Sequence, residues 1–261
     1  MSEYKFWSTE HDGHIATLTL HGCDAINSLN LDVLHELREI SGDLHKQQDV
    51  WAVIVQGEGK HFSGGIDLNV IQELIRRSAA ENRAFMADFQ DCLVTFESLP
   101  KATIAKLRGL CFGGGLILAL CCDFRIASER AVFCQPEIKL GLAIIGTQRI
   151  TRVVGVEAAK ELILLGKRFK AQEALNYRLV HQVVKPEDLD ASVLTMARKF
   201  ERLPPRSVGI SKRIIDESHL RTMQECHEFE VEVMAELLET EDIKEAVASH
   251  IEKRKPEFTG G

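Results

Sequence analysis

Long apolar runs are missing from this sequence of 261 residues, and that absence sets the first limit on function. The longest apolar stretch, residues 116–122, ends at Asp123, whereas a helix needs about 20 apolar residues to cross a bilayer. The N-terminal residues form neither a charged-then-apolar signal pattern nor an Arg-rich presequence. We therefore expect a protein that does not enter a membrane and that is cytoplasmic.

Clustered positive charge and cysteines at Cys-x-x-Cys spacing are missing as well. The chain has 32 Lys and Arg residues against 39 Asp and Glu residues, a formal net charge of -7, and no long basic run. This argues against nucleic acid as a partner, because phosphate binding depends on clustered Lys and Arg. None of the 7 cysteines belongs to a Cys-x-x-Cys pair, so we expect free, mostly buried thiols and a reducing compartment.

Four common site motifs are also absent. No Gly-x-Gly-x-x-Gly follows a strand, and residues 57–61 begin like a phosphate loop but lack its Ser or Thr. Ser63 lacks the glycine two residues before it that a nucleophile elbow needs. The 10 histidines show no spacing typical of metal ligands, so we expect no metal site.

What is present is an ordinary globular composition, with 45% apolar and 27% charged residues, and a regular alternation of patterns. Strand patterns are predicted at 14–20, 52–55, 103–107, 124–127 and, as a last short strand, 179–184. Apolar residues recur every three or four positions at 33–44, 68–75 and 189–200. Strands that alternate with helices predict an α/β layered domain, which we assign to residues 1–200.

The remaining residues, 201–261, have a helical pattern. Pro204-Pro205 separates them from the core, and helices are predicted at 208–215 and over one long polar segment, 223–251. That segment keeps an apolar stripe that contains Val231, Met234, Leu237 and Leu238. A stripe of this kind on a terminal helix is typical of packing against a neighbour, so we predict an oligomerisation region.

Two glycine-bearing turns, at 62–68 and 109–116, each join an apolar strand to a helix. Glycine lets the backbone approach a ligand closely, and the first amides of a helix lack intrahelical partners. Two such turns side by side would aim two amides at one oxygen and form an oxyanion hole. The alternative is that these glycines only permit tight turns and close helix packing.

Glu137 is the third candidate feature. It lies among the apolar residues Phe133, Ile138 and Leu140. A carboxyl group in apolar surroundings has a raised pKa and can carry protons near neutral pH. The alternative is a solvated glutamate in a turn.

Six segments together, in the same order along the chain, resemble the crotonase superfamily of enoyl-CoA hydratases and isomerases. They are residues 24–29, 53–68, 109–123, 133–141, 146–149 and 252–258. The resemblance implies a crotonase (ClpP-like) spiral of ββα turns with a helical C-terminal region used in trimer assembly, as a homotrimer or a dimer of trimers. It also implies an acyl-CoA thioester as substrate and no separate cofactor.

The resemblance further assigns roles to residues. The backbone N–H groups of Ile66 and Gly114 correspond to the oxyanion hole, and Glu137 corresponds to a catalytic glutamate. Contacts with the substrate or its CoA moiety are implied for Ala25, Ile26, Ser63, Gly64, Asp67, Leu68, Gly113 and Ile117. Lys253 and Arg254 are candidate cations for the CoA phosphates.

One departure from the family pattern predicts the reaction. Hydratases of this family carry a second glutamate two positions after the glycine triplet, where this chain has Ile117. With Glu137 alone, the sequence favours a proton shuttle that converts a 3-enoyl-CoA to a 2-enoyl-CoA. Two alternatives stay open: a hydratase that takes its second acid from Asp67 or from residues 68–90, and a non-catalytic acyl-CoA-binding protein. The segment 142–148, which follows Glu137, is also shorter than in hydratases.

Overall fold

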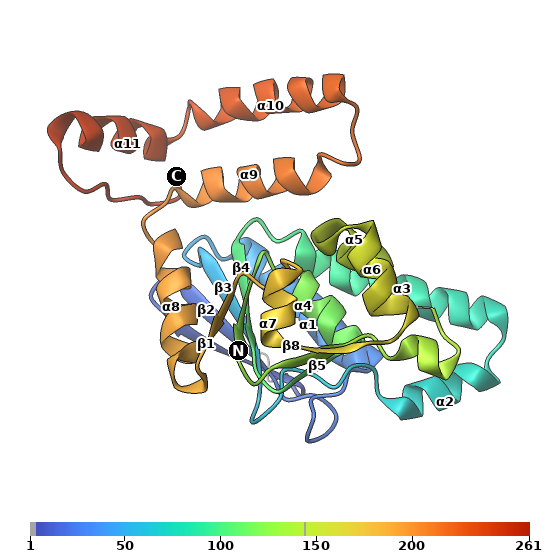
Figure 1. The fold of residues 1–261 in the computed structure, drawn as a ribbon. Coiled ribbons are helices and arrows are strands. Elements are labelled where there is room, and N and C mark those ends of the chain that lie inside the picture. The colour runs from blue at the N-terminus through green and yellow to red at the C-terminus, as the bar shows by residue number, and fades with distance from the viewer. Residues whose placement is uncertain (1–3, 144) are drawn as a thin grey trace.

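The computed structural model describes residues 4–143 and 145–261, and it contains two β-sheets surrounded by helices (Figure 1). The larger sheet has the strand order β1-β2-β3-β4-β6-β9, parallel throughout except between β1 and β2. Its strands are β1 (Trp7–Asp12), β2 (Ile15–Leu20), β3 (Ala52–Gly57), β4 (Ala102–Leu107), β6 (Phe124–Ser128) and β9 (Gln182–Val184). The smaller sheet contains β5 (Leu110–Phe112), β7 (Val132–Cys134) and β8 (Arg168–Lys170), with β5 parallel to β7.

The chain moves repeatedly between the two sheets. From β4 in the larger sheet it enters β5 in the smaller one, passes through helix α4 and then repeats this path with β6 and β7. The helices are α1 (Leu31–Lys46), α2 (Leu68–Arg76), α3 (Ala79–Glu97), α4 (Gly114–Leu120), α5 (Thr147–Val154), α6 (Val156–Leu164), α7 (Ala171–Asn176), α8 (Leu189–Phe200), α9 (Pro205–Glu217), α10 (Met223–Leu237) and α11 (Glu241–Glu252), with short 3-10 helices η1 (Glu137–Leu140) and η2 (Pro186–Asp188). The predicted α/β architecture is therefore confirmed.

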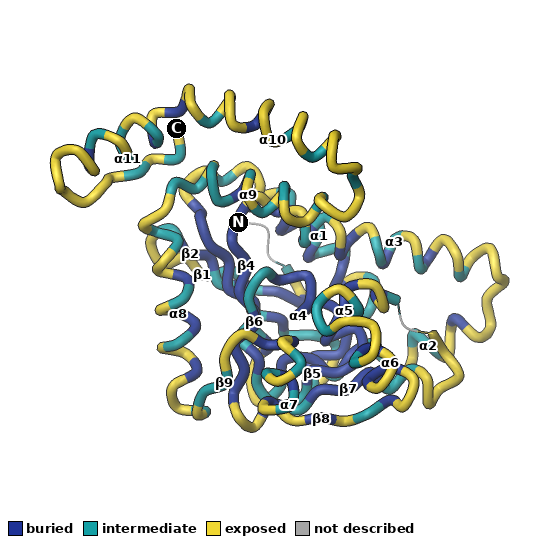
Figure 2. Tube along the Cα trace, turned by 45° about the horizontal axis from the view of Figure 1, so that its top comes forward, coloured by how far each residue is buried: buried dark blue, intermediate teal, exposed yellow. Residues whose placement is uncertain are grey.

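The core lies on both faces of the larger sheet. Burial is concentrated in the strands and in α4, whereas α10 and α11 are mostly exposed (Figure 2). On one face, the predicted helix α1 turns Leu34, Leu37 and Leu44 into the main core, and the Asn30 side chain caps its first turn at Val33 N. On the other face α8 packs Val193 against the sheet. No described helix is long and apolar enough to span a membrane.

Two of the predicted elements differ from the structure. The polar segment 223–251 is two helices rather than one, because the Thr240 hydroxyl accepts a hydrogen bond from Ile243 N and starts α11 as a new helix. Of the predicted last strand, 179–184, only β9 forms a strand. Leu179 and Val180 are buried, which accounts for their apolar pattern, but they lie in the connection that leads to β9.

All seven cysteines are free thiols, and five of them are buried, as the sequence predicted. Cys121 and Cys122 lie where α4 ends, with only 2% of each residue exposed. Burial raises the pKa of the Cys122 thiol to about 12, so this group stays protonated at neutral pH.

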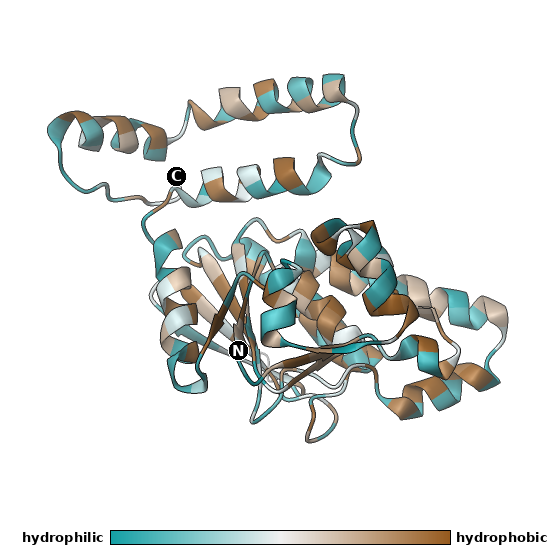
Figure 3. Ribbon diagram, viewed as in Figure 1, coloured by the Kyte–Doolittle hydropathy of each residue, from teal (hydrophilic) through white to brown (hydrophobic). Residues whose placement is uncertain are grey.

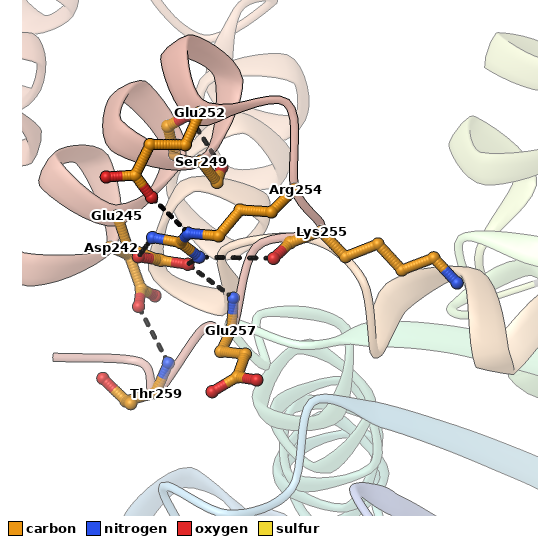
Figure 4. A network of polar contacts seen from close by, with 9 residues as sticks. Asp242, Glu245, Ser249, Glu252, Arg254, Lys255, Glu257 and Thr259 are labelled. Carbon is orange, nitrogen blue, oxygen red and sulfur yellow. Dashed lines mark hydrogen bonds and ion pairs between the residues drawn. The ribbon is translucent and has the colours of Figure 1, made fainter.

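The C-terminal tail folds back onto α11 (Figure 4). The Arg254 guanidinium binds the Glu245 carboxylate at 2.7 Å through Nη2 and the Glu252 carboxylate at 2.6 Å through Nε. Asp242 accepts hydrogen bonds from the backbone N–H groups of Thr259 and Gly260. Arg254 is thus committed to this network, which does not favour its predicted role as a cation for CoA phosphates. Lys253 has no acidic partner among the described residues.

Helix α10 leaves the predicted apolar stripe uncovered within one chain. Val231 is 72% exposed, Met234 57% and Leu238 62%, and apolar segments alternate with polar ones along α9, α10 and α11 (Figure 3). Apolar surface of this extent favours burial against a further subunit. We therefore propose that residues 201–261 assemble the chain into a homotrimer or a dimer of trimers.

Charge placed on this stripe should dissociate the assembly. We expect Val231→Lys combined with Met234→Lys to lower the native mass measured by light scattering, because two ammonium groups would have to be buried without partners. The control, Glu232→Lys with Glu236→Lys, changes the polar face of the same helix and should leave the mass unchanged. A wild-type protein that is monomeric at micromolar concentration would contradict the proposal.

Candidate active site

The two glycine-bearing turns that the sequence singled out lie side by side. Ser63 N donates to Leu110 O at 3.1 Å, and Phe112 N donates to Ser63 O at 3.0 Å, so the turn after β3 is joined to strand β5. Gly115 allows α4 to lie close to this turn, since a Cβ there would be 2.6 Å from the Ser63 Cβ. Two turns more than 40 residues apart in the sequence thus meet at one edge of strand β5.

The backbone amides of Ile66 and Gly114 are close neighbours at this edge. A Cβ built on Gly65 would lie 3.4 Å from Gly114 N, and one built on Gly114 would lie 3.6 Å from Ile66 N. Among the described residues, neither N–H donates to a protein acceptor. Two adjacent, unpaired amide donors are the arrangement that stabilises an oxyanion. Their role in this chain stays a prediction.

Glu137 reaches the same place through the smaller sheet. Because β7 runs parallel to β5, their carboxyl ends meet, and Gly113 N donates to Cys134 O at 2.9 Å. The Glu137 carboxyl then lies against Gly113, where a Cβ would be 2.6 Å from Oε1. Gly113 has φ +51, so both its conformation and its neighbour favour glycine. The Glu137 carboxyl group therefore lies next to Gly113, one residue before the Gly114 amide.

The surroundings of Glu137 are those of a proton carrier. Its Oε2 atom is buried and has no hydrogen-bond partner among the described residues. Burial raises the pKa of the carboxyl group, as the sequence predicted, although two of the apolar neighbours behind that prediction, Ile138 and Leu140, are themselves exposed. A carboxyl group of this kind can accept and release a proton near neutral pH.

This raised pKa predicts a pH-dependent gain in stability for Glu137→Gln. The folded protein binds the carboxyl proton more tightly than the unfolded chain does. The wild type therefore loses stability as pH rises from the unfolded pKa through the folded pKa. We expect the variant to have a higher Tm than the wild type at pH 8 and no advantage near pH 4. A Tm difference that does not change with pH would contradict this reasoning.

Ile117 occupies the position where a second carboxylate would stand in the family pattern. It is 1% exposed and packs under Gly146, where a Cβ would be 2.8 Å from the Ile117 Cγ2 atom. Gly146, at φ +97, is the N-cap of α5. The residue at this position is therefore aliphatic and buried. Of the shortened segment 142–148, residue 144 lies outside the described residues.

The other predicted contact residues lie around the same turns. Ile26 covers Gly64, with its Cδ1 atom 2.4 Å from where a Cβ would stand, and Ala25 beside it is exposed. The Ser63 hydroxyl donates to Asn27 O at 2.7 Å, which ties the two loops together. Their contacts with a substrate stay predictions.

Asp67 and Leu68 lie where helix α2 begins. The Asp67 carboxylate accepts a hydrogen bond from Asn69 N at 2.8 Å and so caps α2, while Leu68 is 64% exposed. This contact gives Asp67 a structural role and weakens the case for it as a second acid. The apolar pattern of α2 correctly predicted a helix, but only Leu74 of this helix is buried.

Among the described residues, side chains that could bind a metal ion come together at one place, which contains none of the predicted site residues. His35, Asp88 and Cys92 lie between α1 and α3. However, Asp88 already binds the His35 ring at 2.7 Å and the Arg38 guanidinium at 3.0 Å. A guanidinium in contact with the central carboxylate would repel a cation, so these residues do not fit a metal ion.

Two large cavities, of about 710 and 550 Å³, lie along α9. Both are lined by α9 residues, including Lys212 and Asp216, and neither is lined by the predicted site residues.

Sequence reasoning also gave no role to Gln135. The signal available was a polar residue at the end of the apolar strand β7, immediately before Pro136.

Comparison with known protein families gives a match over almost the whole chain. The family model described as enoyl-CoA hydratase/isomerase matches residues 10–261. A short-chain-enoyl-CoA hydratase of Clostridium acetobutylicum is 37% identical over 251 residues, which cover 95% of each chain. A crotonyl-CoA hydratase of Syntrophomonas wolfei is 34% identical and covers 95% of this chain and 96% of its own.

Solved structures agree with the sequence comparison. An enoyl-CoA hydratase from Bacillus anthracis superposes with a TM-score of 0.90 at 31% identity, over 98% of this chain and 100% of its own. DspI from Pseudomonas aeruginosa has a TM-score of 0.92 at 31% identity, over 99% of this chain and 98% of its own. The fold that the sequence resemblance implied is thereby confirmed.

Proposed function

Because the chain belongs to the enoyl-CoA hydratase/isomerase family of acyl-CoA enzymes, we propose that it moves the double bond of a 3-enoyl-CoA to give a 2-enoyl-CoA. The observation that carries this proposal is the single carboxyl group at the paired amides. Glu137 lies against Gly113, and Ile117 stands where the family's hydratases carry their second acid.

The proposed reaction needs one proton carrier and one oxyanion hole. The Glu137 carboxylate takes a proton from C2 of the substrate, and the electron pair moves onto the thioester oxygen to give a dienolate. The N–H groups of Ile66 and Gly114 donate hydrogen bonds to that oxygen as its charge develops. Protonated Glu137 then returns the proton to C4, which leaves the double bond between C2 and C3 and restores the carboxylate.

Two features of the site support a shuttle of this kind. Burial raises the pKa of Glu137 and so makes the energies of its charged and neutral forms less different at neutral pH than in a solvated glutamate, which favours a group that both removes and returns a proton. The buried aliphatic side chain of Ile117 has no group that binds water, which disfavours addition of water to the double bond.

A second candidate function is hydration of a 2-enoyl-CoA. The observation in its favour is that relatives at 37% and 34% identity are named short-chain-enoyl-CoA hydratase and crotonyl-CoA hydratase. On this alternative, Glu137 would activate a water for attack at C3 and a proton would be delivered to C2. The water would have to be held by groups other than residue 117.

The test is to incubate the protein separately with trans-3-hexenoyl-CoA and trans-2-hexenoyl-CoA and to resolve the products by mass and retention time. Conversion of the 3-enoyl ester without a change in mass is the expected result. Rapid gain of one water by the 2-enoyl ester, with no shift of the 3-enoyl ester, would replace isomerisation by hydration. Tight binding of both esters with no change in either, and no deuterium exchange at C2, would indicate a binding protein.

A further inference from the structure

Unpaired buried polar atoms are concentrated on two residues that follow strand β7, one of which is Glu137. Five buried side-chain nitrogen or oxygen atoms of the described residues lack a hydrogen-bond partner, and three of them are Gln135 Nε2, Gln135 Oε1 and Glu137 Oε2. Gln135 is only 1% exposed.

Leaving a buried amide unpaired is costly. Each unsatisfied buried polar group lowers the stability of the folded state, whereas an apolar side chain of similar shape, such as Met, would carry no such cost. Buried polar groups in proteins are normally satisfied, and those without a protein partner are commonly satisfied by an internal water. The Gln135 amide therefore indicates a bound group that lies between protein atoms.

The backbone holds Gln135 and Glu137 in a fixed relation. Gln135 directly follows strand β7, and because it precedes Pro136 its backbone is restricted to extended conformations. Pro136, at φ -82, is the N-cap of η1, which begins at Glu137. The unpaired atoms thus belong to one short, rigid segment at the end of β7, where Glu137 meets Gly113.

We infer that Gln135 holds an ordered water that is hydrogen-bonded to Glu137 Oε2, and that Gln135 is a positioning residue for the proton shuttle. A carboxamide suits this task because it has both a donor and an acceptor. When Glu137 is charged, the water donates to the carboxylate and accepts from Gln135 Nε2. When Glu137 is protonated, the water accepts from the carboxyl group and donates to Gln135 Oε1. This inference rests on the proposed function only in assigning the proton shuttle to Glu137.

The test compares Gln135→Met with Gln56→Met. Without the water, the charged form of Glu137 loses a hydrogen bond, so the apparent pKa in the pH profile of kcat should rise. Below that pKa we expect kcat for the 3-enoyl ester to fall about tenfold, the effect of one pKa unit. Below the folded pKa of Glu137, where its carboxyl group is neutral, the Tm should not fall, because the variant removes an amide that has no protein partner. The control Gln56→Met removes an amide that donates a hydrogen bond to the Thr19 hydroxyl at 2.9 Å. The Tm of this variant should therefore fall, while its pH profile of kcat should match that of the wild type.

A second measurement does not depend on turnover. The Tm difference between Gln135→Met and Gln135→Met/Glu137→Gln, followed against pH, reports the titration of Glu137 without the water. Both differences should begin to grow above the unfolded pKa, but we expect this one to level off at a higher pH and at a larger value than the difference between wild type and Glu137→Gln. Coincident titrations, or a Gln135→Met protein whose lost activity follows a lowered Tm, would overturn the inference. If wild type leaves the 3-enoyl ester unchanged, the proposed function fails, but this titration still decides the role of Gln135.

Discussion

Glu137→Gln is expected to lower kcat for the 3-enoyl ester by about 10³-fold, within the 10²–10⁴-fold range typical of a general acid–base group. Glutamine keeps the shape and much of the polarity of the side chain but cannot accept a proton from C2. The amides of Ile66 and Gly114, which we propose bind the oxyanion, are untouched by the change, so the affinity for the product ester should stay close to that of the wild type.

The measurement combines turnover with binding. Initial rates with trans-3-hexenoyl-CoA give kcat, and calorimetric titration with trans-2-hexenoyl-CoA gives Kd. A variant that retains more than a tenth of the wild-type rate would show that Glu137 is not the proton carrier. Loss of binding together with loss of rate would instead mean that the substitution disturbed the site, and the Tm would reveal such a disturbance.

Gly114→Pro should remove one of the two proposed oxyanion donors from the backbone itself. Proline has no N–H, and the first position of a helix, which Gly114 occupies in α4, is where proline is best tolerated. Loss of one donor in an oxyanion hole costs about 10²–10³-fold in kcat. We therefore expect a loss of this size relative to the matched control Gly114→Ala.

The alanine control retains the N–H group and adds only a methyl. Its Cβ would lie 3.1 Å from the Ile66 Cγ1 atom, a tight contact that a small shift of that side chain relieves. Both variants should be compared at equal folded fraction, measured by circular dichroism. Equal rates for the proline and alanine variants would exclude the Gly114 amide from the oxyanion hole.

Much of the fold was predictable from periodicity. Helix α8 was predicted with its observed bounds, since the spacing of Leu189, Val193 and Ala197 matches a helix with one buried face. Strand β8 was missed because its three residues, Arg168–Lys170, are too few for an alternating pattern, and only Phe169 is buried. A strand as short as β8 is determined by its pairing with a neighbouring strand, here β7, rather than by a pattern in its own sequence.

The site was predictable in its parts but not in its arrangement. The sequence indicated Glu137 and the two glycine turns separately, yet their contact depends on the parallel pairing of β5 with β7, and no local pattern encodes that pairing. The role inferred for Gln135 depends on burial without a partner, which exists only after folding. The exposure of Ile75, at 77%, was also unpredictable, because an apolar repeat does not say which surface covers it.

The buried thiols have a practical consequence for experiments on this protein. Cys111, Cys121 and Cys122 are at most 2% exposed, and burial raises the pKa of each thiol. Alkylating reagents attack the thiolate, so these three groups can react only when the chain opens. Cys23 and Cys226 are partly exposed and serve as an internal reference. The rate at which iodoacetamide labels Cys111, Cys121 and Cys122 therefore reports how often the native protein opens, without any denaturant.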